Sequence, residues 1–253
     1  MEDYSIMIKY DNENFDPSLL NDNDIDKIQI NMLPPNSRVL EIGCATGFMS
    51  SFLRENKNCF VCGVESDESQ AKIAIGRCDT VINGSIDSLS VQNKLDSFIQ
   101  ENGKFDVIFM SQVIEHIAYP DKILIKLKDW LKNSENAAIV ISTVNVAHWT
   151  SRLRLLFGKW EYEEYGLFDN THLRFFSVNS FKDEILKAGY SIVEEGYSIY
   201  DFSPLFMIPK IKHLTIYYIC KKLNVLNSKF FNWYVKKFKN FIAYQFVFKI
   251  KKA

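Results

Sequence analysis

The fold of this chain is decided by the stretch Val39-Leu40-Glu41-Ile42-Gly43-Cys44-Ala45-Thr46-Gly47-Phe48. It begins as an apolar, strand-like run, continues as a turn of small residues, and ends where a helix-like segment opens. The two glycines permit backbone angles that a side chain would forbid and let the backbone pass close to a ligand. The following helix offers free N–H groups at its first turn. The stretch therefore predicts a buried strand, a ligand-binding turn and a helix.

Short apolar segments alternate with helix-like segments on both sides of this turn, a pattern typical of βαβ units. We predict helices at 24–33, 48–55, 68–76, 88–100 and 121–131, and a helix that Ser177 or Asn179 caps and Gly189 closes. The predicted strands are Arg38–Ile42, Phe60–Val64, Thr80–Ile82, Phe105–Met110, Ala137–Thr143, Ser191–Ser198 and Gln245–Ile250. We expect an α/β, Rossmann-like sheet of seven mostly parallel strands with helices on both faces.

The chain of 253 residues is long enough for one large domain, and it contains no internal repeat or low-complexity linker. We expect a single domain over 1–253. Within it, 36–143 is the predicted cofactor-binding core, and 144–177, where the regular alternation stops, is the predicted substrate segment. A lysine-rich helical hairpin at 205–241 is predicted as an insertion before the last strand.

Composition indicates an ordinary globular protein with 47% hydrophobic and 24% charged residues. We find no signal-peptide pattern and no apolar run long enough to span a membrane. The five cysteines are an odd number in apolar surroundings, which favours reduced thiols and a cytoplasmic location. Cys59 and Cys62 have no second Cys/His pair at finger spacing, and no dense carboxylate–histidine cluster is evident. We therefore expect no bound metal, with magnesium at Asp169 and nearby acidic residues as the alternative.

The net charge of −1 conceals an asymmetry along the chain. Residues 201–253 contain 11 lysines and one acidic residue, whereas the rest carries 19 basic against 30 acidic residues. Such a basic, aromatic-rich region can contact a membrane surface, nucleic acid or a phosphate-bearing substrate. The alternative is a lysine-coated helical surface whose aromatic residues pack inward.

The turn does not fit two common nucleotide motifs. The dinucleotide pattern G-x-G-x-x-G fails because Ala45 and Phe48 occupy its second and third glycine positions. A phosphate-binding P-loop also fails, because no Gly-Lys-Ser/Thr follows. Glu65 ends the next predicted strand, where a carboxylate can accept both hydroxyls of a ribose. These features favour a nucleoside-containing cofactor other than NAD or ATP.

Residues 36–200 resemble class I S-adenosylmethionine-dependent methyltransferases, through Glu41-x-Gly43-x-Ala45-x-Gly47, then Glu65, then Phe105-Asp106-Val107-Ile108 with Glu115-His116 following. The resemblance implies S-adenosylmethionine as cofactor and S-adenosylhomocysteine as product. It also implies that the glycine turn holds the aminocarboxypropyl part, Glu65 the ribose, and the segment after the third strand the adenine. The implied cofactor residues are Glu41, Gly43, Cys44, Ala45, Gly47, Glu65, Ser66, Ser85, Ile86, Ser111, Gln112 and Val113.

Two later segments, Asn145–Trp149 and Gly166–Ser177, are similar to a methyltransferase subgroup associated with bacterial capsule and O-antigen assembly. The resemblance implies an O-methyltransferase acting on a sugar, or on a phosphorus-containing modification, of a polysaccharide precursor. One alternative is N-methylation of an amino sugar or another small metabolite. A second is a nucleic-acid methyltransferase or binder that uses the basic C-terminal region. We do not expect that partner, since Ser111-Gln112-Val113-Ile114 replaces the Asn/Asp-Pro-Pro-Tyr/Phe loop of many such enzymes.

Histidine is the residue type that can accept a proton from a hydroxyl nucleophile near neutral pH. His172 is the first candidate for the catalytic base, with Asp169 or Glu115 as its orienting partner; the alternative is that it only holds a loop in place. His148 is the second candidate, and His116 is expected in the pocket wall. The predicted substrate-binding residues are Arg174, which can clamp a phosphate or carboxylate, together with Trp149, Asn145 and His116.

Overall fold

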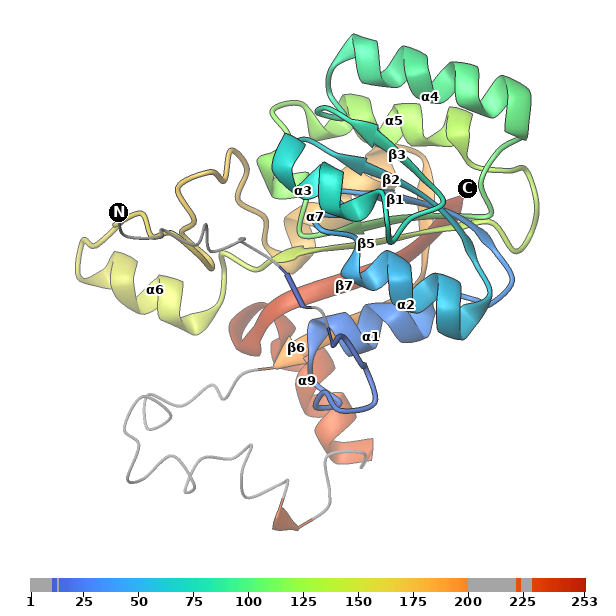
Figure 1. Ribbon diagram of the computed structural model, residues 1–253. Helices are drawn as coiled ribbons and strands as arrows, with labels where there is room; N and C mark the ends of the chain where they lie inside the picture. Colours follow the sequence, from blue (N-terminus) through green and yellow to red (C-terminus); the bar gives the residue numbers. More distant parts are fainter. Residues whose placement is uncertain (1–10, 13, 200–221, 224–228) are drawn as a thin grey trace, which may run out of the picture.

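A computed structural model describes residues 11–12, 14–199, 222–223 and 229–253 of the chain. These residues form one seven-stranded sheet with the strand order β3-β2-β1-β4-β5-β7-β6 (Figure 1). The strands are β1 (Arg38–Ile42), β2 (Phe60–Glu65), β3 (Thr80–Asn83), β4 (Val107–Ser111), β5 (Ala138–Val144), β6 (Tyr190–Ile199) and β7 (Ala243–Lys252). Each overlaps a strand that the sequence predicted.

The first five strands pair in parallel, and β7 runs antiparallel between β5 and β6. The order changes direction on either side of β1: β2 and β3 lie on one side of it, and β4 and β5 on the other. Ligands of open α/β sheets bind outside the carboxyl ends of the strands at such a switch point. The glycine turn after β1 therefore lies where a ligand is expected.

Helices cover both faces of the sheet, as predicted. Side chains alternate along each strand, so Leu40 and Ile42 pack with α4, α5 and α7, whereas Val39 packs with α1 and α2. The helices are α1 (Ile25–Met32), α2 (Phe48–Lys57), α3 (Glu68–Ala74), α4 (Leu89–Asn102), the 3-10 helix η1 (Ile114–His116), α5 (Pro120–Trp130), α6 (Trp149–Leu156), α7 (Val178–Lys187) and α9 (Lys229–Ile242).

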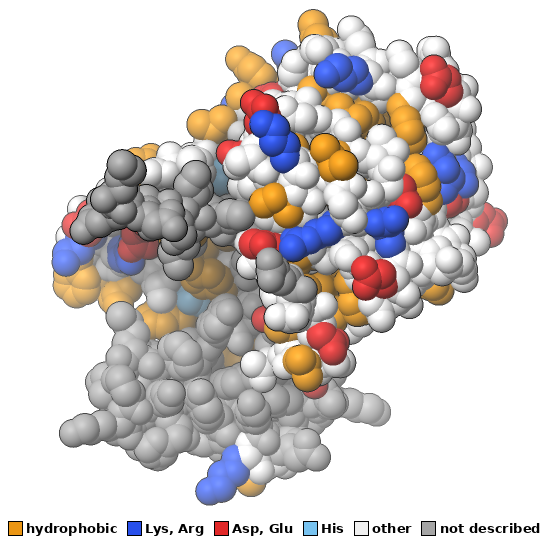
Figure 2. All heavy atoms as spheres, in the orientation of Figure 1, with side chains coloured by type: hydrophobic (Ala, Val, Ile, Leu, Met, Phe, Trp, Pro, Cys, Tyr) orange, Lys and Arg blue, Asp and Glu red, His pale blue; other side chains and the backbone are white. Residues whose placement is uncertain are grey.

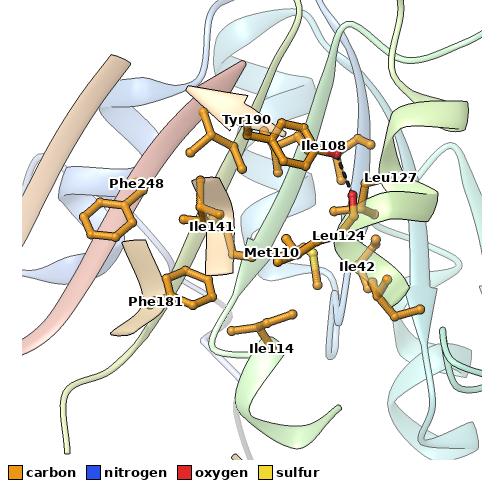
Figure 3. Close-up of a cluster of buried hydrophobic side chains, with 14 of the residues drawn as sticks. Ile42, Ile108, Met110, Ile114, Leu124, Leu127, Ile141, Phe181, Tyr190 and Phe248 are labelled. Carbon is orange, nitrogen blue, oxygen red and sulfur yellow. Dashed lines mark hydrogen bonds between the residues drawn. The ribbon is translucent and has the colours of Figure 1, made fainter. Parts of the chain in front are cut away.

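The larger core lies between the sheet and the helices α4, α5 and α7 (Figure 3). The ring of Tyr190 is buried in this core, and its hydroxyl donates to the carbonyl oxygen of Leu124 at 2.7 Å. Trp130 is also fully buried, and its Nε1–H donates to Asp96 at 2.7 Å. Each buried ring therefore keeps a partner for its polar atom, as buried tyrosines and tryptophans usually do.

Local sequence signals explain where several helices begin. Ser177 caps α7 in a reciprocal arrangement with Ser180, and Gly189, at φ +76°, follows the end of that helix. Asp24 and Asp67 cap α1 and α3 with their side chains. The expectation that Ser177 or Asn179 caps α7 is thus resolved in favour of Ser177.

The substrate segment 144–177 contains α6, which projects away from the sheet (Figure 1). Most of the predicted hairpin 205–241 lies outside the described residues. Its last part is α9, which runs directly into β7. In the described part of the chain, no helix has both the length and the apolar character needed to cross a bilayer.

Candidate active site

The glycine turn between β1 and α2 contains three residues with positive φ angles: Gly43 at +74°, Ala45 at +50° and Gly47 at +78°. The N–H of Gly43 donates to the carbonyl oxygen of Val64 at 2.8 Å, which ties the turn to the end of β2. A Cβ on Gly43 would stand 2.3 Å from Cγ2 of Val113, so glycine is required for space as well as for its backbone angle. The turn is therefore packed tightly against the loop after β4.

Glu65, at the end of β2, is oriented by the backbone around it. Its Oε2 accepts from the N–H of Ala45 and its Oε1 from the N–H of Asp67, both at 2.8 Å, while the Ser66 hydroxyl lies 3.2 Å from Oε1. The side chain is buried, with 7% of its surface exposed. Each carboxylate oxygen can accept about two hydrogen bonds, so Oε2 keeps capacity for a ligand hydroxyl, whereas Oε1 already accepts from the Asp67 N–H and the Ser66 hydroxyl.

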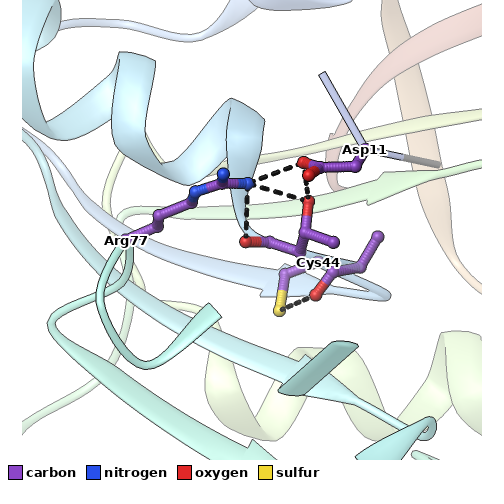
Figure 4. A network of polar contacts seen from close by, with 5 residues as sticks. Asp11, Cys44 and Arg77 are labelled. Atoms are coloured by element: carbon purple, nitrogen blue, oxygen red, sulfur yellow. Dashed lines mark hydrogen bonds and ion pairs between the residues drawn. The ribbon is translucent and has the colours of Figure 1, made fainter. Parts of the chain in front are cut away.

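A polar network closes the outer side of the turn (Figure 4). Asp11 accepts from the hydroxyl of Thr46 and from Nη1 of Arg77, both at 2.7 Å. These bonds, from Thr46 first and then Arg77, hold the pKa of Asp11 below its usual value. Arg77 also donates to the carbonyl oxygen of Thr46 at 3.3 Å. Asp11 is thereby joined to the turn.

Two further buried polar residues lie beneath the turn. Glu41 accepts from the hydroxyl of Ser50, and burial raises its pKa to about 8. Gln29, on α1, donates from Nε2 to the Ser111 hydroxyl at 2.7 Å. Sequence analysis did not single out Gln29, because its partner is 82 positions away and the helix pattern alone says nothing of that contact.

The other predicted cofactor residues have different surroundings. Ile86 is buried after β3, whereas Ser85 is exposed and donates to Asp87. Gln112 has φ +54° and donates from Nε2 to the Ser142 hydroxyl at 2.9 Å. Cys44 is buried beneath the turn beside Cys78. Contact of these residues with a cofactor stays a prediction.

A second polar cluster follows β4 and joins the loop before α7. The N–H groups of Leu173 and Arg174 both donate to the carbonyl oxygen of Glu115, at 2.8 and 2.9 Å, which fixes this loop against η1. In the same cluster, the rings of His116 and His172 lie 4.8 Å apart at an angle of 70°. One ligand atom from each of Glu115, His116 and His172 lies within 4.8 Å of the other two.

Glu115 has an unusual environment for a carboxyl group. Its side chain is fully buried, and no residue of the described chain donates a hydrogen bond of normal geometry to either carboxylate oxygen. Burial raises its pKa to about 8, although the nearby backbone and the Thr143 hydroxyl act in the opposite direction. The sequence indicates Glu115 as part of the family resemblance and as a possible partner of His172, but nothing in the local pattern shows that it is buried.

Asp169 is engaged by its own loop. Its Oδ1 accepts from both the N–H and the hydroxyl of Thr171, at 2.8 and 2.5 Å. Glu115 and Asp169 were the two predicted orienting partners of His172. The side chain of His172 shares a cluster with that of Glu115, and the backbone N–H of His172 donates to the backbone oxygen of Asp169 at 3.1 Å. The role of His172 as catalytic base stays a prediction.

His148, Trp149 and Asn145 build the base of the projecting α6 segment. His148 is buried and caps α6, because its Nδ1 accepts from the N–H of Thr150. Burial lowers its pKa to about 4, so it is neutral at physiological pH. Asn145 is fully buried and donates to the carbonyl oxygen of Ala243 at 2.7 Å, which joins β5 to the start of β7. These contacts are architectural, and a further contact of these residues with a substrate stays a prediction.

Arg174 donates from Nε to the carbonyl oxygen of Ala118 at 2.9 Å and is exposed. Within the substrate segment, Arg154 forms an ion pair with Glu163 at 2.5 Å. Trp160 packs edge-on against Phe168 at 4.7 Å, so part of the aromatic content of this segment serves its own packing. Figure 2 shows histidine side chains, in pale blue, where this segment meets the main body.

Comparison with known proteins gives a consistent family match. A model of the methyltransferase domain family matches residues 21–195. The ubiquinone biosynthesis O-methyltransferase of Pasteurella multocida is 31% identical over 117 residues, which are 43% of this chain and 46% of that protein. The match thus spans a little under half the length of this curated relative.

Two solved structures of S-adenosylmethionine-dependent methyltransferases have a similar fold. The first, from Archaeoglobus fulgidus, is 18% identical with a TM-score of 0.53, over 85% of this chain and 86% of that one. The second, from Mesorhizobium loti, is 12% identical with a TM-score of 0.54, over 89% of this chain and 96% of that one. At these identities the likeness establishes the fold alone.

Proposed function

This chain belongs to the methyltransferase domain family, and we propose that it transfers the methyl group of S-adenosylmethionine to an oxygen atom of a capsule or O-antigen precursor. The acceptor would be a sugar hydroxyl or a phosphorus-containing modification, and S-adenosylhomocysteine would be released. One observation carries the proposal: Glu65 ends β2 and Glu115 follows β4, the two strands that flank β1. Because these three strands are parallel, both groups lie at the same edge of the sheet as the glycine turn.

The residues present fit this cofactor. The turn leaves no space for a Cβ at Gly43, and its backbone can approach a ligand closely. Glu65 is buried and held by two backbone N–H groups, so its carboxylate is oriented before any ribose arrives. The chemistry that the cofactor supplies is an electrophilic methyl group on a sulfonium. The task of the chain is to align an acceptor with that methyl group and to exclude water.

The choice of an oxygen acceptor has two supports. The curated relative from Pasteurella multocida is an O-methyltransferase. In addition, Asn145–Trp149 and Gly166–Ser177 resemble the capsule and O-antigen subgroup. The second segment binds the carbonyl oxygen of Glu115 through two backbone N–H groups, and the N–H of Val146 donates to the carbonyl oxygen of Phe176, which joins the two segments. N-methylation of an amino sugar or small metabolite is the alternative that uses the same scaffold. Peripheral membrane contact of the basic C-terminal region stays a prediction, and nucleic acid is not the expected partner.

Calorimetric titration of the full chain tests the cofactor. We expect micromolar binding of S-adenosylmethionine and S-adenosylhomocysteine, about −8 kcal/mol, and no binding of NAD or ATP. Binding of NAD alone, or of none of these nucleotides, would contradict the proposal.

Transfer of radiolabelled methyl groups to nucleotide-activated sugars, amino sugars and capsule precursors tests the acceptor. Radiolabelled methyl groups found on oxygen atoms of the acceptor support the proposal, whereas methyl groups found only on nitrogen atoms favour the alternative. His172→Ala is expected to reduce turnover on the acceptor while leaving cofactor affinity near that of the parent chain. Unaltered turnover would remove His172 from the acceptor site.

A further inference from the structure

Three residues of the described chain present ligand atoms to a common point outside the cofactor turn. They are Glu115 and His116, on η1, and His172, on the loop before α7. Two imidazoles and one carboxylate form a donor set that binds first-row transition metals and leaves coordination positions open. The separations of up to 4.8 Å exceed the spacing of about 3.4 Å around a tetrahedral zinc ion. Closure by roughly 1.5 Å, which side-chain rotation can supply, would complete the site.

The carboxylate of Glu115 supplies an independent reason to expect a cation. It is fully buried, and neither oxygen receives a hydrogen bond of normal geometry from the described residues. No lysine or arginine in the described part of the chain forms an ion pair with it. Buried carboxylates are normally paired or coordinate metals, because desolvation of an isolated charge is very costly. A bound divalent ion would supply the missing partner.

The surroundings of His116 favour coordination through one particular ring nitrogen. The hydroxyl of Thr171 donates its single proton to Asp169, so it can only accept from Nδ1 of His116, which lies 3.1 Å away. The carbonyl oxygen of Thr171, at 3.3 Å, is a second acceptor for the same nitrogen. Nδ1 therefore carries the proton, and Nε2 carries the lone pair. Metal-bound histidines are commonly oriented in this way, by a hydrogen bond from the other ring nitrogen.

We propose that Glu115, His116 and His172 bind one divalent transition-metal ion, of which zinc is the reference case. Magnesium and calcium fit poorly, because both prefer oxygen ligands, whereas two of these three donors are imidazoles. The proposal departs from the expectation of no metal. It makes His172 a ligand instead of the proton acceptor that its residue type suggested, and it makes Asp169 and Thr171 positioning residues that act through His116.

The location gives the ion a function that rests on the proposed methyltransferase activity. Glu115 and His116 follow directly on the loop after β4, whose Val113 packs against the glycine turn. An ion there has open coordination positions next to the expected methyl group, where the oxygen of the acceptor could bind as a ligand. Binding of the ion itself does not depend on that function and can be measured without any acceptor.

The test uses the full chain, treated with a chelator and then titrated with zinc in a calorimeter, with magnesium as a comparison. We expect one zinc ion per chain and no comparable binding of magnesium. Glu115→Gln and His172→Ala should each weaken zinc binding at least about 100-fold, since loss of a second-shell partner alone costs about 10- to 100-fold. Glu163→Gln is the matched carboxylate control, because Glu163 is exposed and paired with Arg154. It should bind zinc like the parent chain.

A second measurement avoids the variants and separates this site from the cysteines. Zinc added to histidine-labelled protein should shift the NMR signals of His116 and His172 and leave that of His148 in place. Absence of zinc binding, unchanged affinity in both site variants, or unshifted His116 and His172 signals would each overturn the proposal. Binding of S-adenosylmethionine to the chelator-treated chain is measured separately by calorimetry. Absence of zinc binding therefore does not contradict the proposed function, and absence of cofactor binding does not contradict the metal site.

Discussion

The side-chain oxygen Oε2 of Glu65 accepts a hydrogen bond from the backbone N–H of Ala45, with 2.8 Å between the two atoms. Residues 20 positions apart are thus joined at the point where β1 and β2 end. Ala45 has φ +50°, a conformation that non-glycine residues adopt only when their surroundings hold them there. The carboxylate that is expected to bind the ribose therefore also stabilises the turn expected to hold the rest of the cofactor.

The first prediction concerns this double role. Glu65→Ala removes the acceptor of two backbone N–H groups, and Glu65→Gln replaces one acceptor oxygen by a donor that faces an N–H group. Both variants should weaken S-adenosylmethionine binding by about 10- to 100-fold and lower the free energy of unfolding by about 1 to 3 kcal/mol. Calorimetry and urea unfolding measure the two effects. Glu68→Gln, which removes only a surface pair with Lys72, is the control; an unchanged affinity in a folded Glu65 variant would remove the ribose role.

The second prediction concerns the packing of the turn. In Gly43→Ala the new Cβ would stand 2.3 Å from Val113, on a backbone at φ +74°. We expect cofactor binding to fall below detection, with a loss of unfolding free energy of about 1 to 3 kcal/mol from strain and displacement of Val113. Gly103→Ala is a matched control, since Gly103 has φ +82° but nothing within 4 Å of its Cβ position. Equal losses of unfolding free energy in Gly43→Ala and Gly103→Ala would show that the positive φ angle, and not the contact with Val113, causes the loss.

Sequence patterns predicted the sheet because its strands are short, apolar and separated by helices of ordinary amphipathic spacing. Leu40 and Ile42 fall on one face and Val39 on the other, so the alternation of side chains is already visible in the sequence. The position of the glycine turn and of Glu65 follows from the same pattern, because strand ends in a parallel sheet meet at one edge.

Contacts between loops could not be predicted in this way. His116 and Thr171 are 55 positions apart and meet only because two backbone N–H groups bind the carbonyl oxygen of Glu115. The role of His148 as a helix cap was also missed, since histidine is not among the residues favoured at that position. Local periodicity carries no information on such pairings. The residues of the second cluster could therefore be predicted individually, but their contacts with one another could not.

The third prediction concerns the contact between Asp11 and Arg77 across the turn. Asp11→Ala removes the acceptor for the buried Thr46 hydroxyl and for the partly exposed Arg77 guanidinium. The ion pair is partly exposed and contributes little, but the buried Thr46 hydroxyl loses its acceptor, so the variant should lose about 1 to 3 kcal/mol of unfolding free energy. Loss of the Asp11 contacts to the turn should also speed dissociation of S-adenosylhomocysteine several-fold, measured by stopped-flow displacement. Asp16→Asn, which alters only a local turn contact to Ser18, should leave that rate unchanged; the same rate in all three proteins would contradict the prediction.

The fourth prediction concerns the pH dependence of stability. Burial raises the pKa of Glu41 from 4.5 to about 8, and Cys78, Glu65 and Asp26 add to this effect, while Ser50 opposes it. A carboxyl group with a raised folded-state pKa binds more protons in the folded than in the unfolded chain. Its stabilising contribution is complete below pH 4.5 and is lost as the pH rises through about 8.

Glu41→Gln tests this directly, because the amide is neutral at every pH and its oxygen can still accept from Ser50. The parent chain should lose stability between pH 5 and pH 9, whereas the variant should lose about 2 to 4 kcal/mol less over the same range. Asp26, whose pKa is raised to about 7, titrates in both proteins, so the difference between them reports Glu41 together with its electrostatic interaction with Asp26. Urea unfolding of the cofactor-free proteins at each pH gives the slope of unfolding free energy against pH for the parent chain and for Glu41→Gln. Glu55→Gln, at an exposed position of α2, is the control. Parallel slopes for the parent and Glu41→Gln would show that Glu41 is already ionised in the folded chain.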